Sequence, residues 1–136
     1  MKRKVENRPE EILQIALLGH LRVRAMPGAF WFHVPNGQNL PVHIKVLRKR
    51  MGVVAGVPDM IFLYRGQIFG LELKAKGRKR SQEQIDTMNA MEVAGARTAV
   101  ADTLDVAIVT LEHWGLLRRD RNKSGISEGQ QMGEYA

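Results

Sequence analysis

Two carboxylates and an ammonium group near the middle of the sequence could do chemistry together. Asp59 begins one apolar segment, and Glu72 and Lys74 lie near the end of the next one. Carboxylate oxygens are preferred ligands of Mg²⁺ and Mn²⁺, and an ammonium beside such a cation can hold a water and stabilise its deprotonated form. These residue types indicate a metal-assisted hydrolytic site, provided that the fold brings them together.

A β-hairpin would bring them together. The segments on either side of Arg65-Gly66 are rich in β-forming residues, and a two-residue turn between them is typical of a hairpin. In that register Asp59 lies directly opposite Glu72, with Cβ atoms roughly 4.5–5.5 Å apart. Side chains alternate across a strand, so Lys74 shares the face of Glu72.

Facing carboxylates carry a cost that a cation would remove. Like charges in opposed positions destabilise a hairpin by about 0.2–1 kcal/mol, and a divalent cation between them reverses the sign. The alternative is an ordinary solvated hairpin face, on which Glu72 and Lys74 form a surface pair. Pro58 and the small-residue loop before it favour the site, because they leave space beside Asp59.

The rest of the sequence predicts the elements that position this hairpin. Apolar periodicity and helix-terminus residues predict helices, and runs of β-branched and aromatic residues predict strands. Helices are expected at 9–24, 41–51, 82–94 and 104–114, and strands at 30–34, 59–64, 67–74 and 97–101. The fold class that follows is α/β, a small mixed sheet flanked by helices.

The first and third predicted helices have an expected apolar face. Trp31 is expected in the core rather than as a stacking platform for bases. The residues of these faces are Ile12, Leu13, Ile15, Ala16, Leu17 and Leu21 in the first helix, and Ile85, Met88, Met91 and Ala94 in the third. The second is expected to be a short surface helix, with Val42, Val46 and Leu47 on one side.

Length and composition limit the class of protein. The chain has 136 residues, enough for one domain, and no cysteine, which excludes disulfides and thiolate zinc sites. We expect one domain over residues 1–118 and a flexible tail over 119–136, because the tail has no apolar periodicity. No apolar run is long enough for a membrane span or a signal peptide, so the expected compartment is the cytoplasm.

The charge favours a polyanionic partner. Lys and Arg number 21 against 14 Asp and Glu, a net charge of +7, which favours nucleic acid over an anionic membrane. Two basic clusters are candidates for phosphate contact, although a charge run is often only a solvated surface. They are Lys76, Arg78, Lys79 and Arg80 after the hairpin, and Arg48, Lys49 and Arg50 in the second helix.

The order of motifs resembles the PD-(D/E)xK nuclease superfamily, and within it the VRR-NUC (virus-type replication-repair nuclease) family. Pro58-Asp59 followed by Glu72-Leu73-Lys74 is similar to the superfamily signature. Three further features are similar to the VRR-NUC family and extend the resemblance over about residues 9–101. They are Glu10 with Gln14, the segment His33-Val34-Pro35-Asn36-Gly37, and Ser81 with Gln84 at the start of a helix.

The resemblance implies a restriction-endonuclease-like fold and roles for named residues. Asp59 and Glu72 would be metal ligands, and the backbone carbonyl of Leu73 would complete the set. Lys74 would position or activate the attacking water. Glu10 would be the acidic residue of the first helix. It would act either as a metal ligand or by holding a residue that binds the metal, and Glu11 is an alternative for this role. Gln84 matches the family glutamine and is expected at the edge of the site.

The function implied is phosphodiester hydrolysis in DNA with Mg²⁺ or Mn²⁺ and no organic cofactor. We expect an endonuclease that selects structure, such as branched or junction DNA, as in phage proteins of this type, and a homodimer with one site for each strand. One alternative is a sequence-specific restriction or nicking endonuclease. The other is a DNA-binding module without activity.

Overall fold

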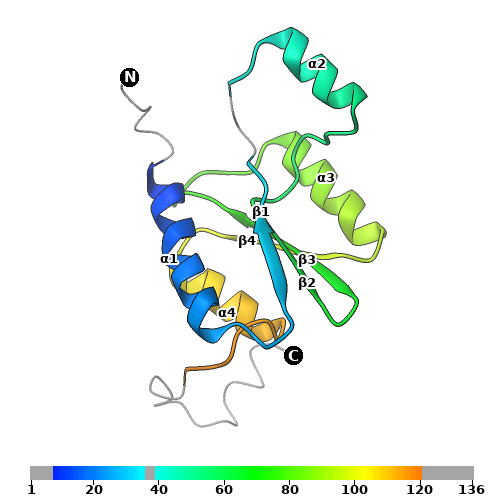
Figure 1. The fold of residues 1–136 in the computed structure, drawn as a ribbon. Helices are drawn as coiled ribbons and strands as arrows, with labels where there is room; N and C mark the ends of the chain where they lie inside the picture. The colour runs from blue at the N-terminus through cyan, green and yellow to red at the C-terminus, as the bar shows by residue number, and fades with distance from the viewer. Residues whose placement is uncertain (1–7, 36–38, 121–136) are drawn as a thin grey trace.

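A mixed sheet flanked by helices forms the body of the protein (Figure 1). The computed structural model describes residues 8–35 and 39–120. The helices are α1 (Arg8–Arg24), α2 (Val42–Arg50), α3 (Gln82–Val93) and α4 (Leu104–His113). The strands are β1 (Phe30–His33), β2 (Met60–Tyr64), β3 (Gln67–Leu73) and β4 (Arg97–Ala101). The predicted α/β fold class is confirmed, and each predicted element is present within two residues of its expected ends.

The sheet has the order β1-β2-β3-β4, with β1, β2 and β3 antiparallel and β4 parallel to β3. Helix α3 makes the connection that a parallel neighbour requires. Tyr64 pairs with Gln67 across a turn in which Arg65 and Gly66 have φ angles of 49° and 76°. Two left-handed residues match the twist of a tight hairpin, so the predicted register is the one observed.

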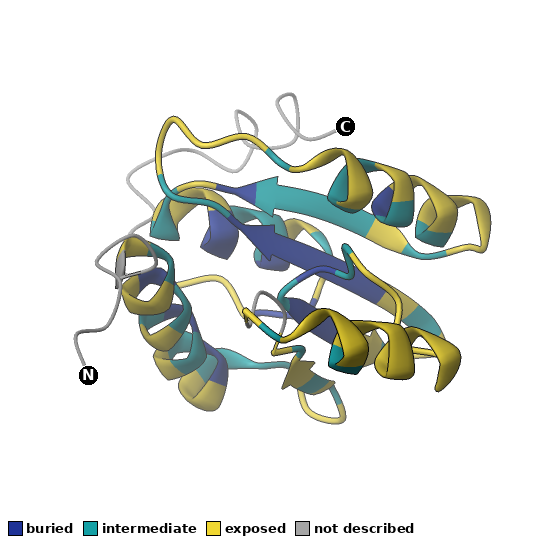
Figure 2. Cartoon of the chain, turned by 90° about the horizontal axis from the view of Figure 1, so that it is seen from above, coloured by how far each residue is buried: buried dark blue, intermediate teal, exposed yellow. Residues whose placement is uncertain are grey.

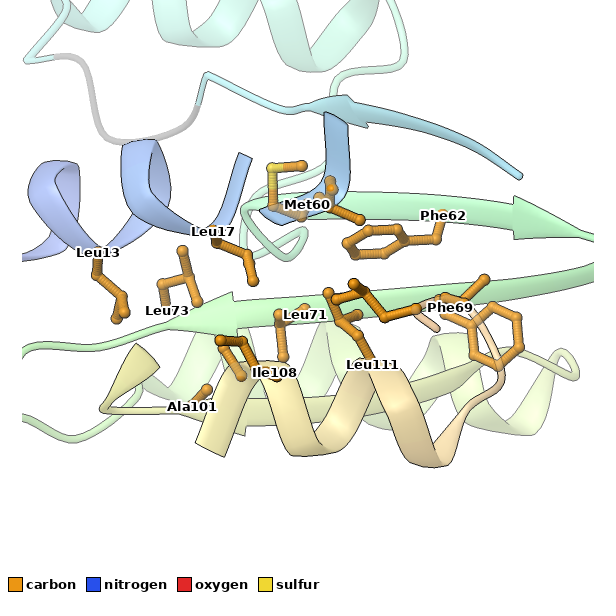
Figure 3. Close-up of a cluster of buried hydrophobic side chains, with 14 residues drawn as sticks. Leu13, Leu17, Met60, Phe62, Phe69, Leu71, Leu73, Ala101, Ile108 and Leu111 are labelled. Atoms are coloured by element: carbon orange, nitrogen blue, oxygen red, sulfur yellow. The ribbon is translucent and has the colours of Figure 1, made fainter. Parts of the chain in front are cut away.

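The hydrophobic core lies between one face of the sheet and the helices α1 and α4 (Figure 3). Strand β3 crosses the middle of the molecule and is buried from Phe69 to Leu73 (Figure 2). The side chains of this core come from five elements and are closed off by Leu116 and Leu117 after α4. Its largest fully buried members are Phe62, Leu17, Leu21, Met60, Leu71, Leu73 and Leu111.

The broad inward face predicted for α1 is too wide. Only the stripe of Leu13, Leu17 and Leu21 is buried, whereas Ile12 and Ile15 are 59% and 69% exposed. Residues four apart lie on one side of a helix, and the sheet covers only that side. In α3, Met88 is buried as expected, but Ala94 is exposed because it caps the C-terminal end of the helix. Trp31 packs against the core, as predicted.

Helix α2 is the short surface helix that the sequence predicts. None of its residues is buried, and Val42, Val46 and Leu47 are 76%, 54% and 49% exposed. The helix stands apart from the sheet in Figure 1, above α3. Its apolar residues therefore do not enter the core.

The described chain remains attached to the body as far as residue 118. Leu117 forms a bridge with Ala25, and the Arg118 N–H donates to the Arg24 carbonyl at 2.9 Å. Most of the tail predicted over 119–136 lies outside the described residues, as do Asn36 and Gly37, so the domain limits remain a prediction. No helix in the described ranges has the length and apolarity to cross a bilayer.

Candidate active site

The hairpin places Asp59 and Glu72 as its register predicts. Met60 pairs with Leu71, so Asp59 comes next to Glu72 at the open end of the hairpin. The Leu73 N–H donates to the Asp59 carboxylate (Oδ2) at 2.8 Å. The hydrogen bond to β3 at this position is therefore accepted by the side chain of Asp59 and not by its backbone. This bond fixes the Asp59 carboxylate against β3.

Glu72 is the only buried charged residue in the described part of the chain, with 2% of its surface exposed. Its Oε1 accepts a hydrogen bond from Gln84 Nε2 at 2.9 Å and lies 3.7 Å from Lys74 Nζ. Its other oxygen, Oε2, is buried without a hydrogen-bond partner. An unpaired buried carboxylate oxygen costs about 1–3 kcal/mol or more, so it points to an occupant such as a cation.

Burial dominates the electrostatics of both carboxyl groups. It raises the pKa of Glu72 to about 8, with a further rise from the negative charge of Asp59 and an opposing effect from the Lys74 ammonium. Burial also raises the pKa of Asp59, against the lowering effect of the Leu73 N–H. Burial thus raises the pKa of Glu72 more than the negative charge of Asp59 does. Without a cation, Glu72 therefore carries a proton at neutral pH.

Two close approaches hold the loop before Asp59. Pro58 packs on β3 at Gly70, where a Cβ atom would lie 2.9 Å from the proline ring. Gly56 has a φ of +83°, and a Cβ there would lie 2.3 Å from the Glu83 carbonyl oxygen. Only glycine fits such a conformation at that distance. The loop is thereby pressed against the first turn of α3, which is the turn that carries Gln84.

Hydrogen bonds hold both the backbone N–H and the side-chain amide of Gln84. The Ser81 hydroxyl accepts from the Gln84 N–H at 3.2 Å, and Gln84 Oε1 accepts from the Ser81 N–H at 2.9 Å, which is the predicted capping box. Because the amide oxygen is occupied there, the amide nitrogen faces Glu72. The same residue thus caps α3 and orients the buried carboxylate.

Glu10 approaches the site from α1, and, beside burial, its negative charge contributes to the raised pKa of Asp59. Its Oε1 accepts from the Ala75 N–H at 3.0 Å, and Glu11 is exposed. Within the described residues no three acidic, histidine or cysteine side chains are grouped as a metal site. The contact holds the chain just after Lys74, and both roles expected for Glu10 stay predictions.

His33 is a site residue for which the sequence predicted no role. Its Nδ1 lies 2.8 Å from the Asp59 carbonyl oxygen, which also accepts from the Val34 N–H at 2.8 Å. The ring and the backbone of β1 therefore hold the backbone of Asp59 from the side opposite β3. The signal present in the sequence was the segment His33-Val34-Pro35, which the resemblance marked without a mechanism.

The donor set fits a hard divalent cation. The Leu73 N–H occupies Oδ2 of Asp59 and the Gln84 amide occupies Oε1 of Glu72, which leaves Oδ1 and Oε2 of these opposed residues for a cation. Oxygen-only sites with one or two carboxylates and remaining waters are typical of Mg²⁺ and Mn²⁺. The Leu73 carbonyl as a further ligand stays a prediction.

The two basic clusters have different surroundings. Lys76, Arg78 and Lys79 are exposed on the loop between β3 and α3, and Arg80 is partly buried with its guanidinium 3.7 Å from the sulfur of Met88. In the other cluster, Arg48 and Lys49 line a cavity of about 780 Å³ between α2 and α3, but Arg50 does not.

The described fold is similar to that of two solved structures, whose descriptions are "VRR_NUC domain protein" and "VRR_NUC domain". The first has a TM-score of 0.64 and 23% sequence identity, covering 77% of this chain and 86% of its own. The second has a TM-score of 0.56 and 18% identity, covering 78% and 97%. No family model and no curated protein matches the sequence. The chain therefore has the VRR-NUC domain fold, as the motif order predicted.

Proposed function

We propose that this protein is a nuclease that hydrolyses DNA phosphodiesters with Mg²⁺ or Mn²⁺ at Asp59 and Glu72. The observation that carries the proposal is the buried Glu72 beside Asp59, with an unpaired oxygen and a lysine 3.7 Å away. A protein that needed only stability would not keep a buried glutamate with an unpaired side-chain oxygen. The VRR-NUC fold supports the same class of activity.

The side chains divide the work of hydrolysis. A divalent cation bound by Asp59 and Glu72 would supply Lewis-acid stabilisation of the charge that develops on the phosphoryl oxygens. Lys74 would donate a hydrogen bond to the attacking water and stabilise the negative charge on its oxygen as the proton passes to solvent. That oxygen would bond to phosphorus as the bond to the leaving sugar oxygen breaks, and the leaving oxygen would take a proton from solvent. Gln84 holds Glu72 in place through its amide, and Glu10 fixes the chain that follows Lys74.

DNA is the proposed substrate because of the charge around the site. The net charge is +7, and the exposed cations Lys76, Arg78 and Lys79 follow Lys74 directly in sequence. Such contacts bind the backbone and carry no sequence information. Selection by DNA structure, with branched DNA first, therefore suits the site better than selection by base sequence.

A homodimer is part of the proposal, because two copies would supply one site for each strand. An uncovered apolar area on the sheet face that carries α3 supports it, with Phe30, Phe32, Leu63 and Ile68 all at least 40% exposed. Exposed apolar areas of this kind mark interaction surfaces. Sedimentation of the wild type and a Phe30→Ser variant tests this: the variant should sediment as a monomer.

A cleavage assay tests the activity. Junction, flap, splayed and linear duplex DNA of matched sequence are incubated with Mg²⁺, with Mn²⁺ and with EDTA. We expect cleavage in the two metals, none in EDTA, and a preference for the branched substrates. Cleavage of linear duplex at one sequence would favour a restriction or nicking enzyme. Binding without cleavage in either metal would favour the DNA-binding module.

A further inference from the structure

Helix α2 contributes cations to the space beside α3. Lys45, Arg48 and Lys49 line the cavity between this helix and α3, whereas Val42 and Val46 are exposed to solvent. An ordinary surface helix turns its apolar side to the body and its charges to water. In α2 three cations instead border the cavity, which suits a negatively charged occupant.

The cavity is cationic and has apolar walls. Beside the three cations it contains one acidic side chain, Glu83, and no ion pair with Lys45, Arg48 or Lys49 forms among residues 8–35 and 39–120. Its apolar walls include Pro35, Leu40, Val53 and Val54. The N–H of Gln84 is capped by Ser81, so the cations of α2 carry the charge of the cavity rather than the end of α3.

The position of the cavity connects it to the proposed chemistry. Gln84 lines it and donates to Glu72, the buried carboxylate of the site. At about 780 Å³ the cavity lies in the range of roughly 300–1,000 Å³ for pockets that hold one small ligand. That is room for one or two nucleotides, and too small to enclose a double helix.

We propose that the cavity between α2 and α3 binds a single-stranded segment of DNA next to the cleavage site. The phosphates contact Lys45, Arg48 and Lys49, and the bases lie against the apolar walls formed by Val53 and Val54. Single-strand sites in proteins combine a cationic track with apolar or aromatic contacts to bases in this way. This inference rests on the proposed nuclease function and specifies which arm of a branched substrate the enzyme holds.

Blocking the cavity reversibly tests the inference. The chain has no cysteine, so a Val54→Cys variant can be modified at one position by a bulky disulfide-forming reagent and restored by dithiothreitol. Val54 is 55% exposed, so the substitution should leave the fold intact. Val23→Cys on α1 is the matched control, because Val23 is 72% exposed and does not line the cavity.

Binding is measured in EDTA by the anisotropy of a labelled oligo(dT) and of a blunt duplex, so the result does not depend on cleavage. We expect modified Val54→Cys to bind oligo(dT) about tenfold more weakly, with recovery in dithiothreitol and little change for the duplex. Unchanged oligo(dT) affinity, or an equal loss for oligo(dT) and duplex, would overturn the inference. If oligo(dT) binding depends on the cavity but the protein cleaves no DNA, only the proposed nuclease function would be contradicted.

A second set of variants tests the cations. Replacing Arg48 and Lys49 with alanine removes two phosphate contacts, which should lower the slope of log affinity against log salt for oligo(dT) by about 1.4. Arg50→Ala is the control, since Arg50 belongs to the same cluster but does not line the cavity. Equal changes in slope for the double variant and for Arg50→Ala would contradict the proposed track.

Discussion

The β2–β3 hairpin and helix α2 lie close together in sequence and use their charged residues in opposite ways. The hairpin draws Glu72 into the interior, where 2% of the residue is exposed, and surrounds it with Gln84, Lys74 and Asp59. Helix α2 buries nothing and keeps its cations around an open cavity. The comparison indicates that the hairpin fixes a few groups for chemistry, whereas the helix offers charge for binding.

The largest expected effect is on cleavage by variants of the hairpin. Asp59→Asn and Lys74→Ala should each lower the cleavage rate by about a thousandfold, because one removes a ligand charge and the other a donor to the developing negative charge. Single-turnover rates on flap DNA in Mn²⁺ measure this. Asp105→Asn on α4 is an exposed control and should cleave as wild type does. Near-normal cleavage by well-folded Asp59→Asn would remove the site assignment.

Substitutions in the β2–β3 hairpin and in α2 should also differ clearly in their effect on the free energy of unfolding. Phe62→Ala in β2 empties a fully buried position and should cost about 3–5 kcal/mol of unfolding free energy. Val46→Ala in α2 should change that free energy by less than about 0.5 kcal/mol, because its side chain is 54% exposed. Urea unfolding of both variants gives the comparison. A large loss for Val46→Ala would mean that α2 packs against a surface of the protein after all.

The pH dependence of stability tests the burial of Glu72. Its pKa is about 8 in the folded protein against an ordinary value of 4.5, so the folded state holds the extra proton between these values. The contribution of Glu72 to stability without metal should be fully present below pH 4.5, decrease as the pH rises by at most about 1.4 kcal/mol per pH unit for one proton, and be absent above about pH 8. The raised pKa of Asp59 acts in the same direction.

Urea unfolding in EDTA at pH 5, 6, 7 and 8 measures this slope. Glu72→Gln cannot ionise, so it should show a flatter profile and be at least as stable as wild type at pH 8. A wild-type profile that rises with pH over this range would show that Glu72 is ionised and solvated without metal.

The smallest effect concerns the exposed loop between β3 and α3. Neutralising Arg78, Lys79 and Arg80 together should weaken duplex binding for every sequence. It should also lower the slope of log affinity against log salt by up to about 2.7, since each phosphate that a side chain neutralises adds about 0.9 to that slope. Arg80 is partly buried against Met88, so the observed change should be somewhat smaller. An unchanged slope would show that this run is only a solvated loop.

The sheet and the hairpin register could be predicted from sequence because local rules agree there. Apolar alternation, the Arg65-Gly66 turn and the β-rich runs all give the same pairing, which places Asp59 beside Glu72. The capping residues of α3 were equally readable, since Ser81 and Gln84 satisfy each other locally. The motif order then indicated the VRR-NUC fold.

The environment of the site could not be predicted in the same way. The Glu72 carboxylate was expected on a face that could be solvated, and its burial depends on α3 and the 52–58 loop, whose close approach needs Gly56. The His33 contact with Asp59 depends on the pairing of β1 with β2. The degree of exposure of Val42 and Val46 could not be predicted from the sequence either. Periodicity shows that a helix has an apolar side, but not whether another part of the protein covers that side.

Metal-dependent stabilisation tests the proposed cation site most directly. Calorimetric melting of wild type and Glu72→Gln is compared in EDTA and in Mn²⁺ at about a hundred times the dissociation constant. If Asp59 and Glu72 hold the cation, wild type should gain about 2.7 kcal/mol in Mn²⁺, because only the folded chain has the site. Glu72→Gln should gain little. Equal gains in the two proteins would show that the cation binds elsewhere and would contradict the assignment of Asp59 and Glu72 as its ligands.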